Sequence, residues 1–443
     1  MSAFVHPDEI RSRFSAALSA MYRAEVPQYG ELLTLVAEVN AEALKADPAG
    51  ADRLAAAGEL ARLSEERHGA IRVGTADELA TIARAFAVMG MAPVSYYNLA
   101  PAGVPVHSTA FRPVDPAALA RNPFRVFCSL LRLELIEDQD LRQEAAAALA
   151  RRDIFTPGAR ALIETAETAG GLDEDQADRF VSELLETFRW HAEATVSAAV
   201  YERLVAAHRL IADVVSFKGP HINHLTPRTL DIDAAQAAMP ERGITPKETI
   251  EGPPARACPI LLRQTSFKAL QEAIAFPGAD GAVQGVHTAR FGEIEQRGCA
   301  LTPKGRALYD DALTTKDFST LPDDWTARRR NGLAWFRYRA TPDGLAGRAD
   351  AADLEALIAK GHVVAEPITY EDFLPVSAAG IFQSNLGAEV RDAYAVDPAK
   401  ADFEQALGRS VLDEMALYAA EQDASVSETL KALQSAPATA RLH

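Results

Sequence analysis

The order strand, helix, strand, strand occurs twice along this chain, and that repetition constrains the fold more than any other feature. The first copy comprises a strand at 67–74, a helix that Thr75 and Glu78 open and Gly90 ends, and strands at 93–99 and 106–112. The second copy comprises a strand through Leu230, a short helix over 234–239, and strands at 259–266 and 287–298. Each copy opens with a histidine. Since the copies share element order and not residues, they predict a duplicated module.

The stretch 214–233, VVSFKGPHINHLTPRTLDID, begins the second copy and carries two histidines three residues apart. Gly219 and Pro220 prevent a helix from continuing through it, so the histidines are expected on extended backbone. Successive side chains of a strand point to opposite faces. His221 and His224 therefore face opposite sides, and only one of them faces a given pocket.

The first copy begins with RHGAIRVG at 67–74, where His68 and Arg72 point to the same side of the strand. Because two neighbouring cations repel, His68 is expected to be neutral, as a metal ligand must be. Alternatively, Arg72 is solvated and His68 is a helix-end residue beside Glu65 or Glu66. The strand by itself favours this second interpretation.

The second copy ends with ARFGEIEQRG at 289–298, where Glu293, Glu295 and Arg297 share one face. Two acids beside an arginine are commonly a solvated charge ladder. Alternatively, one of the acids completes a metal site. Two histidines and one carboxylate from separate strands form the ligand set of non-haem iron(II) oxygenases, which leaves positions open for substrate and dioxygen. Iron suits this set better than structural zinc, because no thiolate and no fourth protein ligand is evident.

The bulk composition restricts the partners and the location. The 443 residues are 48% hydrophobic and 24% charged, as in an ordinary soluble globular protein. The formal net charge of −17 argues against nucleic acid or an anionic membrane as a partner, since both are polyanions. No segment has the length and apolar character of a signal peptide or a membrane span, so a cytoplasmic location is expected. Cys128, Cys258 and Cys299 are too few and too scattered for a disulfide framework or a zinc site and are expected to be buried.

Helical periodicity covers the N-terminus and the middle of the chain. Apolar residues at three- and four-residue steps predict scaffold helices over 7–44 and 51–66. Residues 114–216 are expected to be a helical insertion that covers the strands, with a capping box at Asp173 and Gln176.

Two segments distinguish the C-terminal part. The basic and aromatic run at 326–340 alternates as a strand with a charged outer face. The uncharged segment LPVSAAGIFQSNL at 374–386 has the small side chains that a backbone lying close to a ligand needs. A tight helix start explains the second segment equally well.

Four separated segments resemble the signature segments of the 2-oxoadipate dioxygenase/decarboxylase family, formerly a domain of unknown function. They are RHGAIRVG, FKGPHINHLTPRTLDID, FGEIEQRGCALTPKG and LPVSAAGIFQSNL, in the family's order. The resemblance implies an α+β fold related to the vicinal oxygen chelate proteins, in which βαβββ modules form a half-open β-barrel around a metal, here with large helical insertions. It implies a single intergrown catalytic domain over 1–443, with a helical scaffold at 1–66, metal-binding β modules at 67–113 and 217–300, the insertion at 114–216, and a region at 316–443 that completes the substrate pocket.

The resemblance also implies that His68, His224 and Glu293 hold iron(II), Fe(2+). Glu293 is preferred to Glu295 because FGEIEQR is similar to the FxEIIQR strand of 4-hydroxyphenylpyruvate dioxygenase, where the first glutamate is the ligand. The partners implied are a small 2-oxo diacid and dioxygen, and no oligomeric state is implied.

Arg72, in the HGAIR segment, is similar to the family's substrate-binding arginine, and Val376 and Ser377 match its substrate-contacting pair. The implied reaction converts 2-oxoadipate and dioxygen to 2-hydroxyglutarate, expected as the D isomer, and carbon dioxide, in lysine breakdown. The 2-oxo acid loses its carboxyl group oxidatively, and the carbon next to the new carboxylate is then hydroxylated. Arg72 is expected to pair with the far carboxylate and so to fix the substrate.

Two other functions stay open at the level of sequence. A metal-dependent lyase or isomerase of the vicinal oxygen chelate type would use the same ligands. A non-catalytic diacid-binding protein would need only Arg72, with His68 and Glu293 as structural residues. No role is assigned to His107, His221, Arg263, Lys268, His287 or Glu295.

Overall fold

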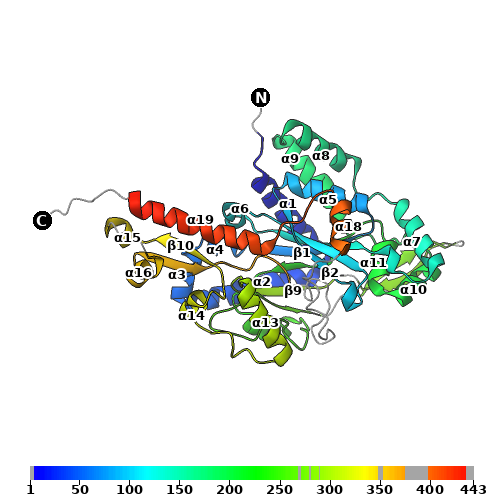
Figure 1. Ribbon diagram of the computed structural model, residues 1–443. Coiled ribbons are helices and arrows are strands. Elements are labelled where there is room, and N and C mark those ends of the chain that lie inside the picture. The colour runs from blue at the N-terminus through cyan, green and yellow to red at the C-terminus, as the bar shows by residue number, and fades with distance from the viewer. Residues whose placement is uncertain are drawn as a thin grey trace.

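Helices cover both faces of a central five-stranded sheet, and the long helix α19 (Glu414–Ser435) lies at one end of the molecule beside strand β10 (Phe336–Ala340) (Figure 1). This computed structural model describes residues 4–267, 271–278, 281–288, 290–347, 353–374 and 398–435. The mixed α and β class expected from the sequence is confirmed. No helix within the described ranges combines the length and the apolar character that crossing a bilayer requires.

Proline begins each of the first three helices. Pro7, Pro27 and Pro48 occupy first-turn positions, where the missing backbone N–H has no partner to lose and the fixed φ suits a helix. The helices predicted over 7–44 and 51–66 are confirmed, with a break at Gly58, whose φ is +73°. They are α1 (Pro7–Glu25), α2 (Pro27–Ala46), α3 (Pro48–Ala56) and α4 (Glu59–Arg62).

The five-stranded sheet contains all three strands of the first copy of the repeated order. Its strands are β1 (Arg67–Val73), β2 (Ala92–Asn98), β3 (Val106–Arg112), β4 (Arg125–Leu131) and β5 (Leu225–Pro227), arranged β2-β3-β4-β1-β5. Only β1 and β4 are parallel. Helix α5 (Ala76–Val88) follows β1, and the Thr75 hydroxyl accepts the Glu78 N–H at 3.2 Å, as the predicted helix start requires.

The segment 114–216 is not wholly helical, because residues 125–131 form β4 between β1 and β3. The prediction of an uninterrupted helical insertion is therefore wrong at this point. Every residue of β4 is buried, and its sequence RVFCSLL, apolar except for Arg125 and Ser129, lacks the alternation of a half-exposed strand. The remaining elements are helices, and the capping box of Asp173 with Gln176 is confirmed. They are α6 (Pro116–Arg121), α7 (Gln139–Ala150), α8 (Pro157–Ala169), α9 (Glu174–Leu185), α10 (Ala198–Ala207) and α11 (Arg209–Ser216).

Alternate side chains of β1 belong to two different cores. Ile71 and Val73 pack with apolar residues of α1, α5, α8 and α9. Ala70 packs on the opposite face with apolar residues of α7, α10 and α11, together with Phe373. His68 and Arg72 are two residues before and after Ala70, so they lie on its side of the sheet.

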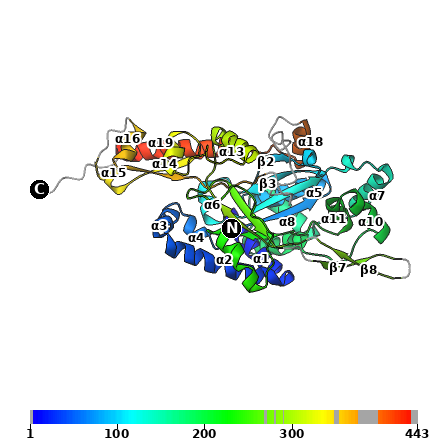
Figure 2. The same cartoon turned by 90° about the horizontal axis from the view of Figure 1, so that it is seen from below.

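The second copy of the repeated order is built around a two-stranded antiparallel pair. Its elements after β5 are α12 (Ile232–Ala238), β6 (Leu262–Ser266), β7 (Glu272–Phe276), β8 (Val283–His287) and β9 (Glu293–Arg297). Strand β6 pairs with β9, while β7 and β8 form a separate hairpin that extends away from the central sheet (Figure 2).

The single strand predicted at 287–298 is two pieces, since His287 ends β8 and Glu293 begins β9. Gly292 lies against Phe267 so closely that a Cβ there would meet a ring carbon at 1.6 Å. Any larger residue at this position would therefore require the ring of Phe267 to move.

The C-terminal part adds helices and another two-stranded sheet, formed by β10 and β11. The strand predicted over 326–340 is wrong in its first half, because the Asp324 carboxylate accepts the Ala327 N–H at 2.6 Å and begins helix α14. The three cysteines are free and buried, as predicted. The further elements are α13 (Pro303–Thr315), α14 (Trp325–Arg330), α15 (Pro342–Gly347), α16 (Leu354–Ala359), β11 (Val363–Pro367) and α18 (Pro398–Leu407), with 3₁₀ turns at Ala100–Ala102, Leu133–Leu135, Glu186–Phe188 and Pro240–Arg242.

Candidate metal centre

Three side chains from separate segments meet at one buried point. His68 comes from β1, His224 directly precedes β5, and Glu293 begins β9. The Nε2 atoms of His68 and His224 lie 3.2 and 3.8 Å from Oε2 of Glu293. One donor atom from each residue lies within 4.8 Å of the others, and all three residues are buried. They are therefore close enough to bind a single metal ion.

Strand register produces this convergence. Strands β1 and β5 are antiparallel with His68 opposite Thr226, and the Thr229 N–H just beyond β5 donates to the Glu295 carbonyl of β9 at 2.7 Å. A side chain at Gly69 would place its Cβ 2.9 Å from the carbonyl oxygen of His224. Glycine at this position thus lets the His224 backbone approach β1.

The charge states of His224 and Glu293 suit a metal ligand set. Burial lowers the pKa of His68, but the carboxylates of Glu295 and Glu293 outweigh it and raise the pKa overall, so the prediction of a neutral His68 is wrong for the metal-free protein. Burial lowers the pKa of His224 to about 4, so its imidazole is neutral at neutral pH. Both of its ring nitrogens are buried and have no hydrogen-bond partner among the described residues. Burial raises the pKa of Glu293, but the imidazoles of His224 and His68 outweigh it and lower the pKa overall. A buried carboxylate beside a neutral imidazole with unused nitrogens fits a divalent cation.

Hydrogen bonds and aromatic rings fix the ligands. The Thr226 hydroxyl and the Gln264 amide donate to Oε2 of Glu293 at 2.9 and 3.2 Å. The ring of Phe373 meets His68 edge-on at 5.0 Å, and Phe291 meets His224 in the same way at 4.9 Å. These contacts hold the donor atoms in place and exclude water from behind them.

Arg72 lies two residues beyond His68 on the same side of β1 and contacts a buried acid. Its Nη1 donates to Asp213 of α11 at 2.9 Å. The other oxygen of Asp213 lies 2.9 Å from His287 and 3.3 Å from His221. Burial raises the pKa of Asp213, but His221, His287 and Arg72 together hold that pKa well below its usual range. The ionised carboxylate therefore holds one edge of the Arg72 guanidinium in a fixed orientation.

A buried network of ion pairs stands behind His68. Nδ1 of His68 lies 2.9 Å from Oε2 of Glu295. Burial raises the pKa of Glu295, but Arg297 and His68 outweigh it and lower the pKa to about 2. The glutamate therefore stays ionised throughout the physiological range.

Comparison with known proteins identifies the family. The family model described as 2-oxoadipate dioxygenase/decarboxylase matches residues 14–385. The chain belongs to this family. The 2-oxoadipate dioxygenase/decarboxylase of Escherichia coli (strain K12) is 61% identical over 94% of this chain and 97% of its own length, and that of Pseudomonas putida is 56% identical over 97% and 98%. The crystal structure of the hydroxyglutarate synthase of Pseudomonas putida in complex with 2-oxoadipate superposes with a TM-score of 0.91 at 54% identity, covering 98% of this chain and 100% of that one.

The residues proposed as ligands from the family resemblance come together, and the two histidines of the second copy separate as predicted. His224 faces Glu293, whereas His221 faces Asp213. Val376, Ser377 and Lys268 lie outside the described residues.

Two residues without an assigned role belong to other environments. Arg263 forms an ion pair with Asp233 at 2.6 Å, and the ring of His107 lies 4.7 Å from that of Phe403.

Sequence reasoning missed the supporting residues. Thr226, Gln264 and Asp213 are ordinary polar residues in the sequence, and only the register of the strands and the packing of α11 bring them to the ligands and to Arg72. A signal did exist at Arg125, because an arginine at the start of a mostly apolar strand must find a buried acid.

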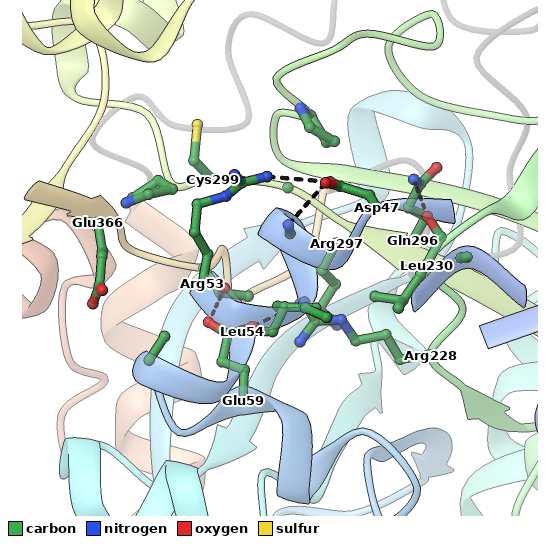
Figure 3. Close-up of a pocket in the computed structure, with 18 of the residues that line it drawn as sticks. Asp47, Arg53, Leu54, Glu59, Arg228, Leu230, Gln296, Arg297, Cys299 and Glu366 are labelled. Carbon is green, nitrogen blue, oxygen red and sulfur yellow. Dashed lines mark hydrogen bonds and ion pairs between the residues drawn. The ribbon is translucent and has the colours of Figure 1, made fainter. Parts of the chain in front are cut away.

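A cavity of about 290 Å³ lies beside the ion-pair network and not at the metal ligands. Helices α2 to α4 form one wall and β9 contributes to another, with Arg53, Glu59, Arg228 and Glu366 among the lining side chains (Figure 3). None of the three candidate metal ligands lines it. The cavity is therefore distinct from the candidate metal centre.

Proposed function

We propose that this chain is an iron(II)-dependent enzyme that converts 2-oxoadipate and dioxygen to D-2-hydroxyglutarate and carbon dioxide, in lysine catabolism. The observation that carries the proposal is the meeting of His68, His224 and Glu293 at one buried point. Membership of the family and the similarity to a hydroxyglutarate synthase whose structure holds 2-oxoadipate support the substrate.

The donor set favours iron over structural zinc. Two imidazoles and one carboxylate leave up to three positions free, and no cysteine belongs to the group of ligands. Iron(II) held by these residues would supply open coordination positions and redox chemistry for a 2-oxo acid and dioxygen. Thr226 and Gln264 hold the carboxylate of Glu293 while these positions are filled.

Arg72 recognises the second carboxylate of the substrate. The two-residue separation of His68 and Arg72 along β1 corresponds to about 6.6 Å between their Cα atoms. Three methylene groups separate the keto carbon of 2-oxoadipate from its far carboxylate, which matches a site that holds one end near His68 and the other near Arg72. Asp213 contacts Nη1 of Arg72, so the remaining nitrogens of the guanidinium are available to the substrate.

The proposal also includes a half-open barrel and a single catalytic domain. The two copies, joined where β5 lies between β1 and β9, form the half-open barrel of the vicinal oxygen chelate type within one catalytic domain over 1–443. The region 316–443 completes the pocket, and the packing of Phe373 on His68 supports this. Val376 and Ser377 as substrate contacts and a cytoplasmic location stay predictions.

Oxygen consumption tests the reaction. Protein purified anaerobically and loaded with ferrous ion should consume one dioxygen for each 2-oxoadipate and release one carbon dioxide. With ¹⁸O₂, one labelled atom should enter the new carboxylate of 2-hydroxyglutarate and one its hydroxyl group, because the reaction adds both atoms of dioxygen to the substrate carbons. Carbon dioxide release without oxygen uptake would instead identify a lyase, and protein that retains 2-oxoadipate but no iron would identify a binding protein.

A further inference from the structure

We infer that Glu295 is a positioning residue for the metal centre: clamped by Arg297, its carboxylate holds His68 so that Nε2 of the imidazole faces the metal. This inference rests on the proposed role of His68 as a ligand. It assigns a function to the second acid of the EIEQR strand, the one that does not belong to the group of ligands.

The two nitrogens of His68 face two different carboxylates. Nδ1 lies at ion-pair distance, 2.9 Å, from Oε2 of Glu295 without the alignment of a hydrogen bond, and Nε2 lies 3.2 Å from Oε2 of Glu293. A neutral imidazole carries one proton, and a carboxylate at Nδ1 favours the proton there. The lone pair of Nε2 then points at the space shared with His224 and Glu293. A carboxylate behind a ligating histidine fixes the ring and increases its basicity.

Arg297 determines where the Glu295 carboxylate lies. Its Nε and Nη2 donate to the two oxygens of Glu295 at 2.9 and 3.0 Å, in a two-pronged pair. Its Nη1 donates to the carbonyls of Tyr370 and Asp372 at 2.8 and 3.0 Å. The guanidinium is thus tied to the backbone, and it presents Glu295 to His68 in one geometry.

Charge balance shows why a neutral side chain cannot replace Glu295 without effect. The ion-pair network behind His68 contains four arginines and four glutamates, which are Arg62, Arg125, Arg228, Arg297, Glu59, Glu66, Glu295 and Glu371. Its positive and negative charges are equal. Loss of the Glu295 charge leaves an uncompensated buried cation next to His68, which repels a metal cation.

Glu59 offers a matched control within the same network. It pairs with Arg228 at 2.9 Å and lines the cavity of Figure 3, and the acid of the network that contacts His68 is Glu295. Replacing Glu59 therefore removes one charge from the network without touching the imidazole. A role of Glu295 in general stability would make the two substitutions equivalent.

The experiment measures Co(II) binding by the full-length, metal-free protein through the visible absorption of the bound ion. For Glu295→Gln we expect the Kd for Co(II) to rise by about 10- to 100-fold, as for other carboxylates behind ligating histidines. For Glu59→Gln the Kd should stay within about twofold of wild type, because its ion pair does not reach the ligands. In ¹H NMR of the Co(II) protein, the shifted N–H signal of His68 should exchange faster with solvent in Glu295→Gln and not in Glu59→Gln.

A second pair of variants separates the possible failures. His68→Ala should lose Co(II) binding; wild-type affinity in that variant would overturn the ligand assignment and the proposed function with it. If His68→Ala loses the metal while Glu295→Gln keeps wild-type affinity, the inference about Glu295 alone is wrong. Should Glu295→Gln fail to fold by circular dichroism, Arg297→Lys decides. Lysine keeps the positive charge but cannot donate two parallel hydrogen bonds to the Glu295 carboxylate. Co(II) binding weaker by at least about threefold therefore supports the inference, and unchanged binding overturns it.

Discussion

Replacing Arg72 with alanine should reduce turnover of 2-oxoadipate far more than turnover of 2-oxohexanoate, which lacks the second carboxylate. The side chain of Arg72 is 17% exposed, and Asp213 fixes one of its nitrogens at 2.9 Å. A guanidinium held in this way is prepared for a charge-assisted pair with the far carboxylate of a diacid. The monoacid 2-oxohexanoate has no second carboxylate for this guanidinium to bind.

The magnitude follows from the contact that is lost. A hydrogen bond to a charged group contributes about 1.5–3 kcal/mol, which is a factor of about 10 to 150 in kcat/KM. The variant also leaves the ionised Asp213 facing the second carboxylate, and that repulsion adds to the loss. Arg72→Ala combined with Asp213→Asn removes the repulsion and should recover part of the activity toward the diacid.

The assay compares kcat/KM for the two substrates by oxygen uptake in wild type, Arg72→Ala and the double variant. Both substrates share the 2-oxo acid group, so general damage to the metal centre lowers both values and cancels in their ratio. The ratio of diacid to monoacid should fall by about 10- to 150-fold. An unchanged ratio would refute the role of Arg72 in recognising the second carboxylate.

Three further predictions concern the ligands and the buried network. His224→Ala should abolish iron retention and turnover while the circular dichroism spectrum stays that of wild type, whereas His191→Ala should keep both; an active His224→Ala would contradict the ligand assignment. Glu66→Gln should lower the free energy of unfolding in urea by about 3–5 kcal/mol, because it leaves buried arginines uncompensated, while Glu42→Gln at the surface should change it little; equal effects would count against the network. Burial raises the pKa of Glu371, but neighbouring arginines lower it to about 2 from its ordinary value of 4.5. Its ionised form therefore stabilises the folded state fully above about pH 4.5, and this contribution should be lost as the pH falls towards about 2, seen as a falling urea midpoint that Glu371→Gln makes less steep.

The first copy of the repeated order was predictable because its signals are local. The side chain of Thr75 caps the start of α5. Apolar and polar residues alternate along β2 and β3, or turn residues lie at their ends. The shared face of Glu293, Glu295 and Arg297 was also predictable, because alternation along a strand needs no tertiary information.

The rest depends on partners that are distant in the sequence. Strand β4 has no alternation because both of its faces are covered, so its pattern did not distinguish it from the helices around it. The meeting of His68, His224 and Glu293 depends on the registers of β1 with β5 and of β5 with β9, which local patterns do not encode. Glu293 is the proposed ligand and Glu295 the proposed positioning residue, because each faces a different ring nitrogen of His68.

Anomalous diffraction from crystals soaked anaerobically with ferrous ion and 2-oxoadipate tests the central claim most directly. We predict one iron peak at about 2.0–2.2 Å from Nε2 of His68, Nε2 of His224 and a carboxylate oxygen of Glu293, with the far carboxylate of 2-oxoadipate at Arg72. Iron bound at other residues in crystals of active protein, or bound without His68, would contradict the account.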